Sequence, residues 1–291
     1  MQRRSMRIVV VTVAMITALA GAGRTSAEQI KFISACQTLS DFNTVYKLAK
    51  DIGNCGWCLN VANDKITIDL QGHSITSTCA PNVGGGAAIT QDFAVPNDLI
   101  TVKNGSINGY FAGVELATST RVSVLGVKTT NNYINGVWLG AYALVKFTES
   151  SGNSYGIEVG PHSQVQQSKA HNNEIVGILA HGDNCLITMN TANSNGVGIW
   201  MDDGGVRCTV SYNTANDNLH EGILGVGGDP GDLITHNVAA NNQQWQGGPS
   251  IDLGDFLLNC PATVAFNKST NGFPASYHFL GTTNCQTVGN E

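Results

Sequence analysis

Gly113-Val114-Glu115-Leu116 is the first copy of a four-residue phrase that recurs along the middle of the chain. Each copy has glycine or serine, then a β-branched residue, any residue, and a small or apolar residue. The copies are GVEL at 113–116, GVWL at 136–139, GIEV at 156–159, GILA at 177–180, GIWM at 198–201, GILG at 222–225 and SIDL at 250–253. Their starts are separated by 23, 20, 21, 21, 24 and 28 residues. A period in the low twenties predicts a solenoid, in which each repeat buries its apolar side against its neighbours.

An asparagine stands shortly before each phrase and keeps the same period. These residues are Asn108, Asn132, Asn153, Asn173, Asn195, Asn218 and Asn242. The segments NTANSN (190–195), NTANDN (213–218) and NVAANN (237–242) repeat the same corner three times. Because stacked asparagines can bond amide to amide between neighbouring strands, we expect an asparagine ladder at one corner of the coils.

Short β-branched segments follow the phrases and supply the remaining sides of each coil, as in Val122-Ser-Val124, Val145-Lys-Phe147 and Leu186-Ile187. The coils are roughly 22 residues long, with polar corners and no helical period. This pattern predicts an all-β fold, a single-stranded right-handed parallel β-helix of about ten coils with an N-terminal cap.

The segment Ile66–Thr76 (ITIDLQGHSIT) is similar to the opening coil of the right-handed parallel β-helix repeat superfamily. This pectate lyase-like group includes pectate lyases, polygalacturonases and mannuronan epimerases. The resemblance covers about residues 30–285. It implies the fold and an association with carbohydrate, through binding or sugar hydrolysis. It selects no specific enzyme family, because one fold hosts many functions.

The first 27 residues have the pattern of a secretory signal. Arg3, Arg4 and Arg7 precede an apolar run, Ile8–Ala20, and small residues end the segment. The run is too short for a membrane span, so we expect a secreted or periplasmic protein. The predicted parts are a signal peptide at 1–27, a cap at 28–58, the β-helix at 59–285 and a C-terminal tail at 286–291.

The composition limits the partners of the chain. Charged residues make up 12% of the chain and its net charge is −6. Once the signal is removed, the only arginines are Arg121 and Arg207. Nucleic acid binding needs clustered lysine and arginine on one face, so this class of partner is excluded. The same shortage weakens tight binding of a polyanion, and a polysaccharide is the partner that we expect.

All eight cysteines follow the signal, which favours disulfide bonds in an exported chain. Cys185 and Cys208 each stand seven residues before the alanine of their corner, so they occupy the same place on adjacent coils. Adjacent strands lie about 4.8 Å apart, which a disulfide can span. The predicted pairs are Cys36–Cys55, Cys58–Cys79, Cys185–Cys208 and Cys260–Cys285. A metal hook at Cys55-Gly-Trp-Cys58 is the alternative, but no second CxxC completes it.

The third residue of each phrase is expected to point outward, because alternate side chains of a strand face opposite sides. The outward set is Glu115, Trp138, Glu158, Leu179, Trp200, Leu224 and Asp252. In the enzymes that the chain resembles, this face forms the floor of the substrate cleft. Indole rings can carry a sugar and carboxylates can accept bonds from its hydroxyls. We therefore predict that Trp138, Glu158, Trp200, Glu115 and Arg207 bind substrate, although exposed tryptophans can also simply shield a sheet.

Histidines and aspartates gather just after the phrases. His181 and Asp202 share the fourth place after the leading glycine, His162 and Asp183 share the sixth, and Asp203 follows Asp202. Paired carboxylates with a histidine can divide acid and base roles in glycoside cleavage, so these five residues are the predicted catalytic group. The same oxygens could hold Ca²⁺, the one metal that we consider. Aspartate, glycine and histidine are also ordinary turn residues, which is the structural alternative.

Two enzyme families share parts of their motifs with the chain. A polygalacturonase resemblance rests on Asp202-Asp203, but Ala180-His181-Gly182 precedes that pair and no Arg-x-Lys segment exists. A mannuronan epimerase resemblance rests on the ends of Tyr155–His162, whose middle differs. We therefore predict an exported protein that binds and processes a polysaccharide as a lyase, a glycoside hydrolase or an epimerase. A glycan-binding or adhesive surface scaffold is the alternative.

Overall fold

The computed structural model describes residues 28–79, 85–202, 207–225, 231–242, 254–270, 275–280 and 285–291. The described strands form two parallel sheets. Sheet B, with 11 strands, consists of β2 (Gln37–Leu39), β4 (Leu59–Val61), β7 (Ala87–Gln91), β9 (Ala112–Leu116), β11 (Asn135–Leu139), β14 (Tyr155–Val159), β17 (Val176–Ala180), β20 (Val197–Met201), β23 (Ile223–Gly225), β26 (Gly254–Asn259) and β29 (Ala275–Leu280).

Sheet A has 19 strands, and most coils give it two. Its strands are β1 (Gln29–Ile33), β3 (Thr44–Leu48), β5 (Ile66–Asp69), β6 (Ser74–Thr76), β8 (Thr101–Asn108), β10 (Ser123–Thr130), β12 (Leu144–Lys146), β13 (Glu149–Ser151), β15 (Gln164–Gln166), β16 (Lys169–His171), β18 (Leu186–Thr188), β19 (Thr191–Asn193), β21 (Thr209–Ser211), β22 (Thr214–Asn216), β24 (Asp232–Thr235), β25 (Val238–Ala240), β27 (Ala262–Ala265), β28 (Lys268–Thr270) and β30 (Gln286–Val288).

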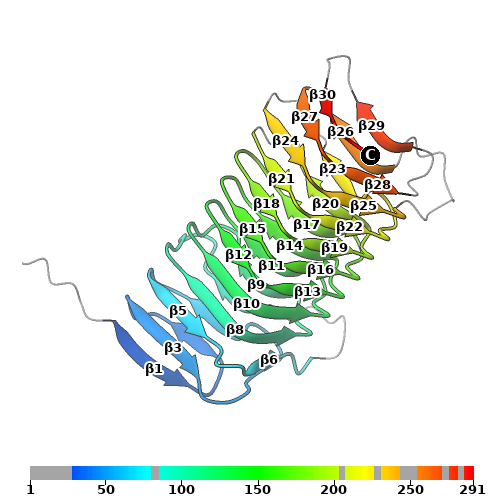
Figure 1. Cartoon of the computed structure of the whole chain (residues 1–291). Coiled ribbons are helices and arrows are strands. Elements are labelled where there is room, and N and C mark those ends of the chain that lie inside the picture. Colours follow the sequence, from blue (N-terminus) through cyan, green and yellow to red (C-terminus); the bar gives the residue numbers. More distant parts are fainter. Residues whose placement is uncertain are drawn as a thin grey trace, which may run out of the picture.

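The strands stack coil upon coil into an elongated parallel solenoid, as the period predicts (Figure 1). Each sheet B strand pairs with the sheet B strands of the coils before and after it, and β8 and β10 show how sheet A is built. These two long strands run through a bend at which later coils split into separate strands, so β10 pairs with both β12 and β13. The chain is thus an all-β parallel β-helix.

The core lies inside the coils and is made of residues that repeat once per coil. The second residues of the phrases, Val114, Val137, Ile157, Ile178, Ile199 and Ile223, are all 0% exposed. They stack on one another because Val137 pairs with Val114 and Ile157, and so on along sheet B. Full burial of one such side chain stabilises the fold by about 1.5–3 kcal/mol. The period seen in the sequence is therefore the period of the core.

The predicted asparagine ladder is confirmed from Asn132 onward at the corner before sheet B. Asn108 was wrongly included, because its Oδ1 accepts from Asn131, which stands beside the ladder. Asn132, Asn153, Asn173, Asn195 and Asn218 are at most 3% exposed. In each step the side-chain amide donates to the Oδ1 of the next asparagine, at 2.9 Å from Asn173 to Asn195. The same Oδ1 accepts the backbone N–H of the preceding asparagine, at 3.0 Å in that step. The ladder thus satisfies backbone groups that the corner would otherwise leave unpaired.

A second ladder, which the sequence prediction merged with the first, runs along the bend inside sheet A. Asn190, Asn213, Asn237 and Asn267 bond in sequence at 2.9–3.0 Å, and Asn290 ends the row. The segment NTANSN therefore spans two corners, with Asn190 in one ladder, Asn195 in the other, and β19 between them. The interpretation of these six residues as a single corner is wrong.

The last predicted phrase also differs. Ser250–Leu253 lies outside the described residues, and the strand that pairs with β23 is β26, in which Leu257 stands opposite Leu224. Asp252 is therefore not assigned to the outward row. The N-terminal residues 28–58 contain β1, β2 and β3, and β3 pairs with both β1 and β5.

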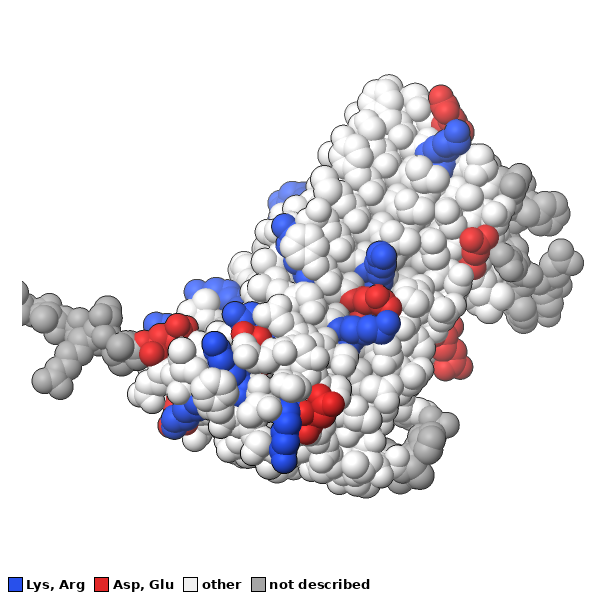
Figure 2. Space-filling model, turned by 60° about the horizontal axis from the view of Figure 1, so that its bottom comes forward, with Lys and Arg blue, Asp and Glu red and all other residues white. Residues whose placement is uncertain are grey.

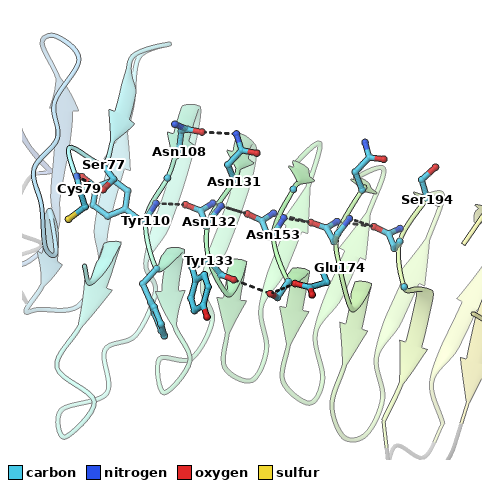
Figure 3. A pocket seen from close by; sticks show the side chains of 18 of the residues that line it. Ser77, Cys79, Asn108, Tyr110, Asn131, Asn132, Tyr133, Asn153, Glu174 and Ser194 are labelled. Atoms are coloured by element: carbon cyan, nitrogen blue, oxygen red, sulfur yellow. Dashed lines mark hydrogen bonds between the residues drawn. The ribbon is translucent and has the colours of Figure 1, made fainter. Parts of the chain in front are cut away.

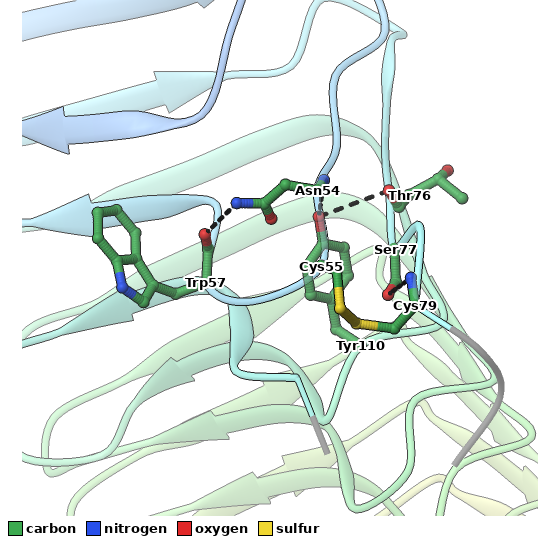
Figure 4. Close-up of a disulfide and its surroundings, with 7 residues drawn as sticks. All are labelled: Asn54, Cys55, Trp57, Thr76, Ser77, Cys79 and Tyr110. Atoms are coloured by element: carbon green, nitrogen blue, oxygen red, sulfur yellow. Dashed lines mark hydrogen bonds between the residues drawn. A yellow bond between two sulfur atoms is a disulfide. The ribbon is translucent and has the colours of Figure 1, made fainter. Parts of the chain in front are cut away.

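Both predicted disulfides of the N-terminal coils are wrong. The bonds are Cys36–Cys58 and Cys55–Cys79, with sequence separations of 22 and 24 residues. Register explains the first, because Gln37 pairs with Leu59 and the preceding cysteines therefore lie side by side. The second follows from the Thr78 N–H, which donates to the Asn54 carbonyl at 3.1 Å and brings the next residues together. Figure 4 shows this disulfide beside Tyr110.

Of the two remaining predicted pairs, Cys260–Cys285 is confirmed and Cys185–Cys208 is wrong. Cys260 and Cys285 form a disulfide with their Cα atoms 5.0 Å apart. Cys185 and Cys208 lie side by side as predicted, since Leu186 pairs with Thr209, but both are buried free thiols. The Cys185 N–H donates to the Cys208 Sγ at 3.3 Å. Contact between the thiols lowers the pKa of Cys185 and raises that of Cys208.

Charged side chains are sparse on the face shown in Figure 2, and positive and negative groups lie interspersed. Most are near the N-terminal coils, where Lys31 pairs with Asp41 at 2.7 Å. Within the described ranges, no helix has the length and apolar character needed to cross a membrane.

Candidate functional site on the outer face of sheet B

The outer face of sheet B carries the predicted row of outward side chains. The strand register places Trp138 opposite Glu115 and Glu158, then Leu179, Trp200 and Leu224 on successive coils. A second outward row stands three residues earlier on each strand and includes Asn135, Tyr155, Val176 and Val197. Glu115 and Trp138 are partly buried, and burial raises the pKa of Glu115. The row combines acidic and aromatic groups on one rigid sheet.

A hydrogen-bonded chain of three side chains crosses the end of this face. His181 Nε2 lies 3.0 Å from Glu158 Oε1, and His181 Nδ1 lies 2.8 Å from Asp202 Oδ2. We call these residues the acid–histidine chain. The hydrogen bond with Glu158, reinforced by its charge and by Asp202, raises the pKa of His181 despite partial burial. The two carboxylates thus favour the charged form of the imidazole between them.

Asn135 extends this chain to a fourth coil and was not found by sequence reasoning. Its Nδ2 donates to Glu158 Oε2 at 2.6 Å, so both oxygens of Glu158 have a donor. Glu158 is the least exposed member, with 13% of its side chain accessible, against 38% for His181 and 32% for Asp202. The sequence offered one signal: Asn135 directly precedes the leading glycine of its phrase, as Tyr155 does one coil later, and the two residues pair. Glu158 is therefore fixed in position by its neighbours.

The C-terminal part of this face is apolar. Val176, Leu179, Val197 and Leu224 form a buried cluster, against which Trp200 packs. Among the described residues, the buried indole N–H of Trp200 has no hydrogen-bond partner. An unused buried donor is costly, so this group is suited to meet an acceptor on a bound ligand. Glu221, one coil further, is 6% exposed, and burial raises its pKa.

Three predicted site residues lie elsewhere in the corner after sheet B. The His162 ring stacks on that of Tyr142, with ring centroids 4.8 Å apart. The backbone N–H of His162 donates to the backbone carbonyl of Asp183 at 2.7 Å. Arg207 donates from Nε to Asn184 Oδ1 at 3.2 Å. The count from the glycine misplaces His162 because Val159 pairs with Ala180, a step of 21, whereas Gln164 pairs with Leu186, a step of 22.

The predicted shared position of His162 and Asp183 on adjacent coils is therefore wrong, because the turn between β17 and β18 holds an extra residue. His162 takes the left-handed conformation, φ 59°, as do its neighbours in this corner, Tyr142 and Asn184. Asp203 lies outside the described residues. The structure brings together His181 and Asp202, and adds Glu158 from the predicted binding set.

A groove of about 990 Å³ runs along the opposite corner, before sheet B, and was missed entirely (Figure 3). We call it the corner groove. Its floor is the first asparagine ladder, and its walls come from residues on either side of each ladder asparagine. The sequence held a signal for one wall, since Asn131, Gly152, Asn172 and Ser194 each directly precede a ladder asparagine. All four have left-handed backbones, which turn them outward from the ladder.

The fold and the site together define a pectate lyase-like parallel β-helix with an acidic and aromatic face. Similar solved structures are the A-module of mannuronan C-5 epimerase AlgE4 from Azotobacter vinelandii (12% identity, TM-score 0.67, 91% of this chain and 84% of that one) and DFA-IIIase without its lid from Arthrobacter chlorophenolicus A6 (11%, 0.54, 90% and 81%). Pectate lyase Pel9A is also similar (13%, 0.50, 88% and 68%). At these identities the likeness shows the fold alone.

The chain belongs to the family described as "Periplasmic copper-binding protein (NosD)", which matches residues 63–248. No curated protein sequence matches it. The donor groups do not fit a copper centre, because the described residues contain no group of three or more His, Cys, Asp or Glu placed to hold a metal. Both ring nitrogens of His181 already face carboxylates.

Proposed function

We propose that the protein binds an uncharged polysaccharide on the outer face of sheet B and cleaves it by acid–base catalysis over Trp138. The observation that carries this proposal is the place of Trp138 between Glu115 and Glu158, one strand away on either side. An indole ring offers a flat amphipathic surface to a sugar ring. Carboxyl groups on both sides of that ring can divide the acid and base roles of glycoside hydrolysis.

The charges of the face favour a neutral substrate over a polyuronate. Glu115, Glu158, Asp202 and Glu221 are acidic, and His181 is the one basic side chain that the acid–histidine chain contains. Arg207, which the sequence suggested as a substrate ligand, bonds instead to Asn184. A uronate would meet repulsion on such a face, because like charges in a partly desolvated cleft repel strongly.

The two glutamates differ in environment, which assigns their roles. Burial raises the pKa of Glu115, which favours this residue as the acid that donates a proton to the leaving oxygen. Glu158 is fixed by Asn135 and His181, and takes a proton from the water that attacks the anomeric carbon. Asp202 holds His181 in turn. The strands that carry Glu115 and Glu158 are two strand spacings apart, about 9.6 Å. This distance is near the carboxyl separation of about 6.5–9.5 Å in inverting glycosidases.

An extracytoplasmic location supports this activity. Three disulfides join cysteines of the described residues, and disulfides persist in oxidising compartments. The family description also names the periplasm. We propose that the protein is secreted or periplasmic, where it meets polysaccharide directly.

Turnover and binding of purified oligosaccharides test the proposal together. Cellohexaose, mannohexaose and xylohexaose are incubated with the wild type, with and without added Ca²⁺, and products are followed by new reducing ends and by the anomer formed. We expect cleavage with inversion. Glu158→Gln and Glu115→Gln should each lower turnover by about 10²–10⁴-fold while binding persists. Trp138→Ala should weaken binding.

Binding without turnover in every form, wild type included, would leave only a glycan-binding scaffold. Hexagalacturonate is the charged control, and tighter binding of it than of the neutral sugars would contradict the substrate class. Gln164→Leu, on the exposed side of sheet A, is the control variant and should match the wild type.

A further inference from the structure

The corner groove is separate from the outer face of sheet B. The sheet B strands begin at the ladder corner and end at the acid–histidine chain, so the groove and the chain lie at opposite ends of the same strands. Ser154 in the groove and Glu158 in the chain, for instance, are joined by β14. No residue that lines the groove belongs to the acid–histidine chain.

Two walls of different chemistry flank the ladder. In Figure 3, Asn108 and Asn131 lie on one side of the ladder asparagines, and Tyr133 and Glu174 lie on the other. Asn131 Nδ2 donates to Asn108 Oδ1 at 3.2 Å, which aligns the amide wall. On the opposite wall Ser154 Oγ lies 3.3 Å from Glu174 Oε2.

Aromatic rings mark the end of the groove nearest the Cys55–Cys79 disulfide. Phe111 and Tyr133 lie with ring centroids 5.9 Å apart, and the Tyr133 side chain is exposed, its residue being 52% accessible. Cys79, which is bonded to Cys55, and Tyr110 line this end of the groove (Figure 3). An exposed tyrosine ring beside a half-buried phenylalanine ring and a polar groove offers a surface on which a sugar ring can stack.

The groove carries little charge. The described residues that line it include one carboxylate, Glu174, and no lysine, arginine or histidine. Amides and hydroxyls can each donate and accept hydrogen bonds, as sugar hydroxyls also do. The walls repeat once per coil, at about 4.8 Å, which is close to the length of one pyranose unit in an extended chain. The amides of Asn108, Asn131 and Asn172 and the hydroxyl of Ser194 thus face successive sugar units, and Gly152 leaves one coil of this wall without a side chain.

From these observations we propose that the corner groove is a second binding site, which holds an uncharged, extended glycan along the solenoid axis. Its aromatic end stacks the terminal sugar on Tyr133 and Phe111, and its amide wall bonds the hydroxyls of the following units. Glu174 excludes anionic chains. The site retains polysaccharide and does not depend on cleavage at the outer face of sheet B.

The test isolates this site by removing the other one. Titration calorimetry is carried out on the full chain carrying Trp138→Ala, with cellohexaose, mannohexaose, xylohexaose and hexagalacturonate as probes. At least one neutral hexasaccharide should still bind, and adding Tyr133→Ala should weaken it about tenfold. Tyr212→Ala is the matched control, since this tyrosine is 56% exposed at the bend inside sheet A.

Three results would overturn the proposal: no neutral hexasaccharide binds the Trp138→Ala protein, Tyr133→Ala leaves affinity unchanged, or Tyr212→Ala weakens it as much. Tighter binding of hexagalacturonate would also overturn it, because Glu174 would then not exclude anions. Each result is independent of turnover, so a failure of the proposed catalysis leaves the groove proposal standing or falling on its own.

Discussion

The N-terminal coils and the middle coils hold their neighbours together in different ways. The first coils are cross-linked by Cys36–Cys58 and Cys55–Cys79, and the first ladder begins only where the Tyr110 N–H donates to Asn132. From Asn132 onward a row of amides runs along the coils instead, and a second row joins it from Asn190. Covalent bonds thus secure the end of the stack, and hydrogen bonds secure its repeating part. The acid–histidine chain and most of the corner groove lie in the hydrogen-bonded part, where each coil can vary its other corner residues.

The disulfides of the N-terminal coils should make the largest contribution to the free energy of unfolding. Replacing Cys55 and Cys79 by alanine removes a bond that closes a long loop, so the free energy of unfolding should fall by about 2–4 kcal/mol. Chemical denaturation measures the change. Cys185→Ala with Cys208→Ala is the control, because it deletes two thiols and no cross-link, and it should keep the wild-type sensitivity to reductant. Equal loss of that sensitivity in both double variants would contradict the assigned pairs.

The ladder should contribute nearly as much at a single position. Asn195→Leu removes bonds to Asn173, Asn218 and the Ala170 carbonyl, and it leaves buried backbone groups unpaired. We expect a loss of about 1–3 kcal/mol in unfolding free energy.

Gln164→Leu provides the control for this change, since Gln164 is exposed and pairs with Leu144 and Leu186 on the neighbouring coils. A thermal midpoint as high for Asn195→Leu as for Gln164→Leu would show that the amide row does not stabilise the stack.

The smallest effect concerns His181 and depends on pH. Its pKa is raised in the folded protein, so its contribution is complete below the ordinary value of 6.5 and is lost as the pH rises through the raised value. The side chain is 38% exposed, which limits the contribution to below about 1 kcal/mol. The stability difference between the wild type and His181→Gln should therefore shrink as the pH rises above 6.5.

Thermal unfolding across this pH range measures the difference. His162→Gln serves as the control, because it removes a histidine outside the acid–histidine chain. A difference that grows with pH would mean that the two carboxylates do not hold the imidazolium.

Sequence reasoning succeeded where structure repeats and failed where the repeat breaks. The phrase from Gly113 onward predicted the core, the outward row and one ladder, because strand pairing conserves the side of each residue over every coil. It also placed His181 next to Asp202. It misplaced His162, because one extra residue in a turn shifts all that follows, and turn length has no signal in a hydrophobic period.

Sequence reasoning missed the N-terminal disulfide pairs for a related reason, and it missed Asn135 as the partner of Glu158 in the same way. Cys36 and Cys58 precede paired strands, which only the register of β2 with β4 reveals. Asn135 reaches Glu158 across one coil from a different outward row. Such contacts depend on side-chain direction at the surface of a sheet, where no core residue constrains the sequence.

The split of NTANSN between two corners has a consequence for how such a chain can change its length. Residues 176–196 contain β17, β18 and β19, together with Asn190 and Asn195, one amide for each ladder. A tandem duplication of this one segment therefore inserts one complete coil and leaves no gap in either asparagine ladder. It also extends the corner groove by one sugar unit. One duplication would therefore change the length of the solenoid, the number of ladder bonds and the length of the corner groove at the same time.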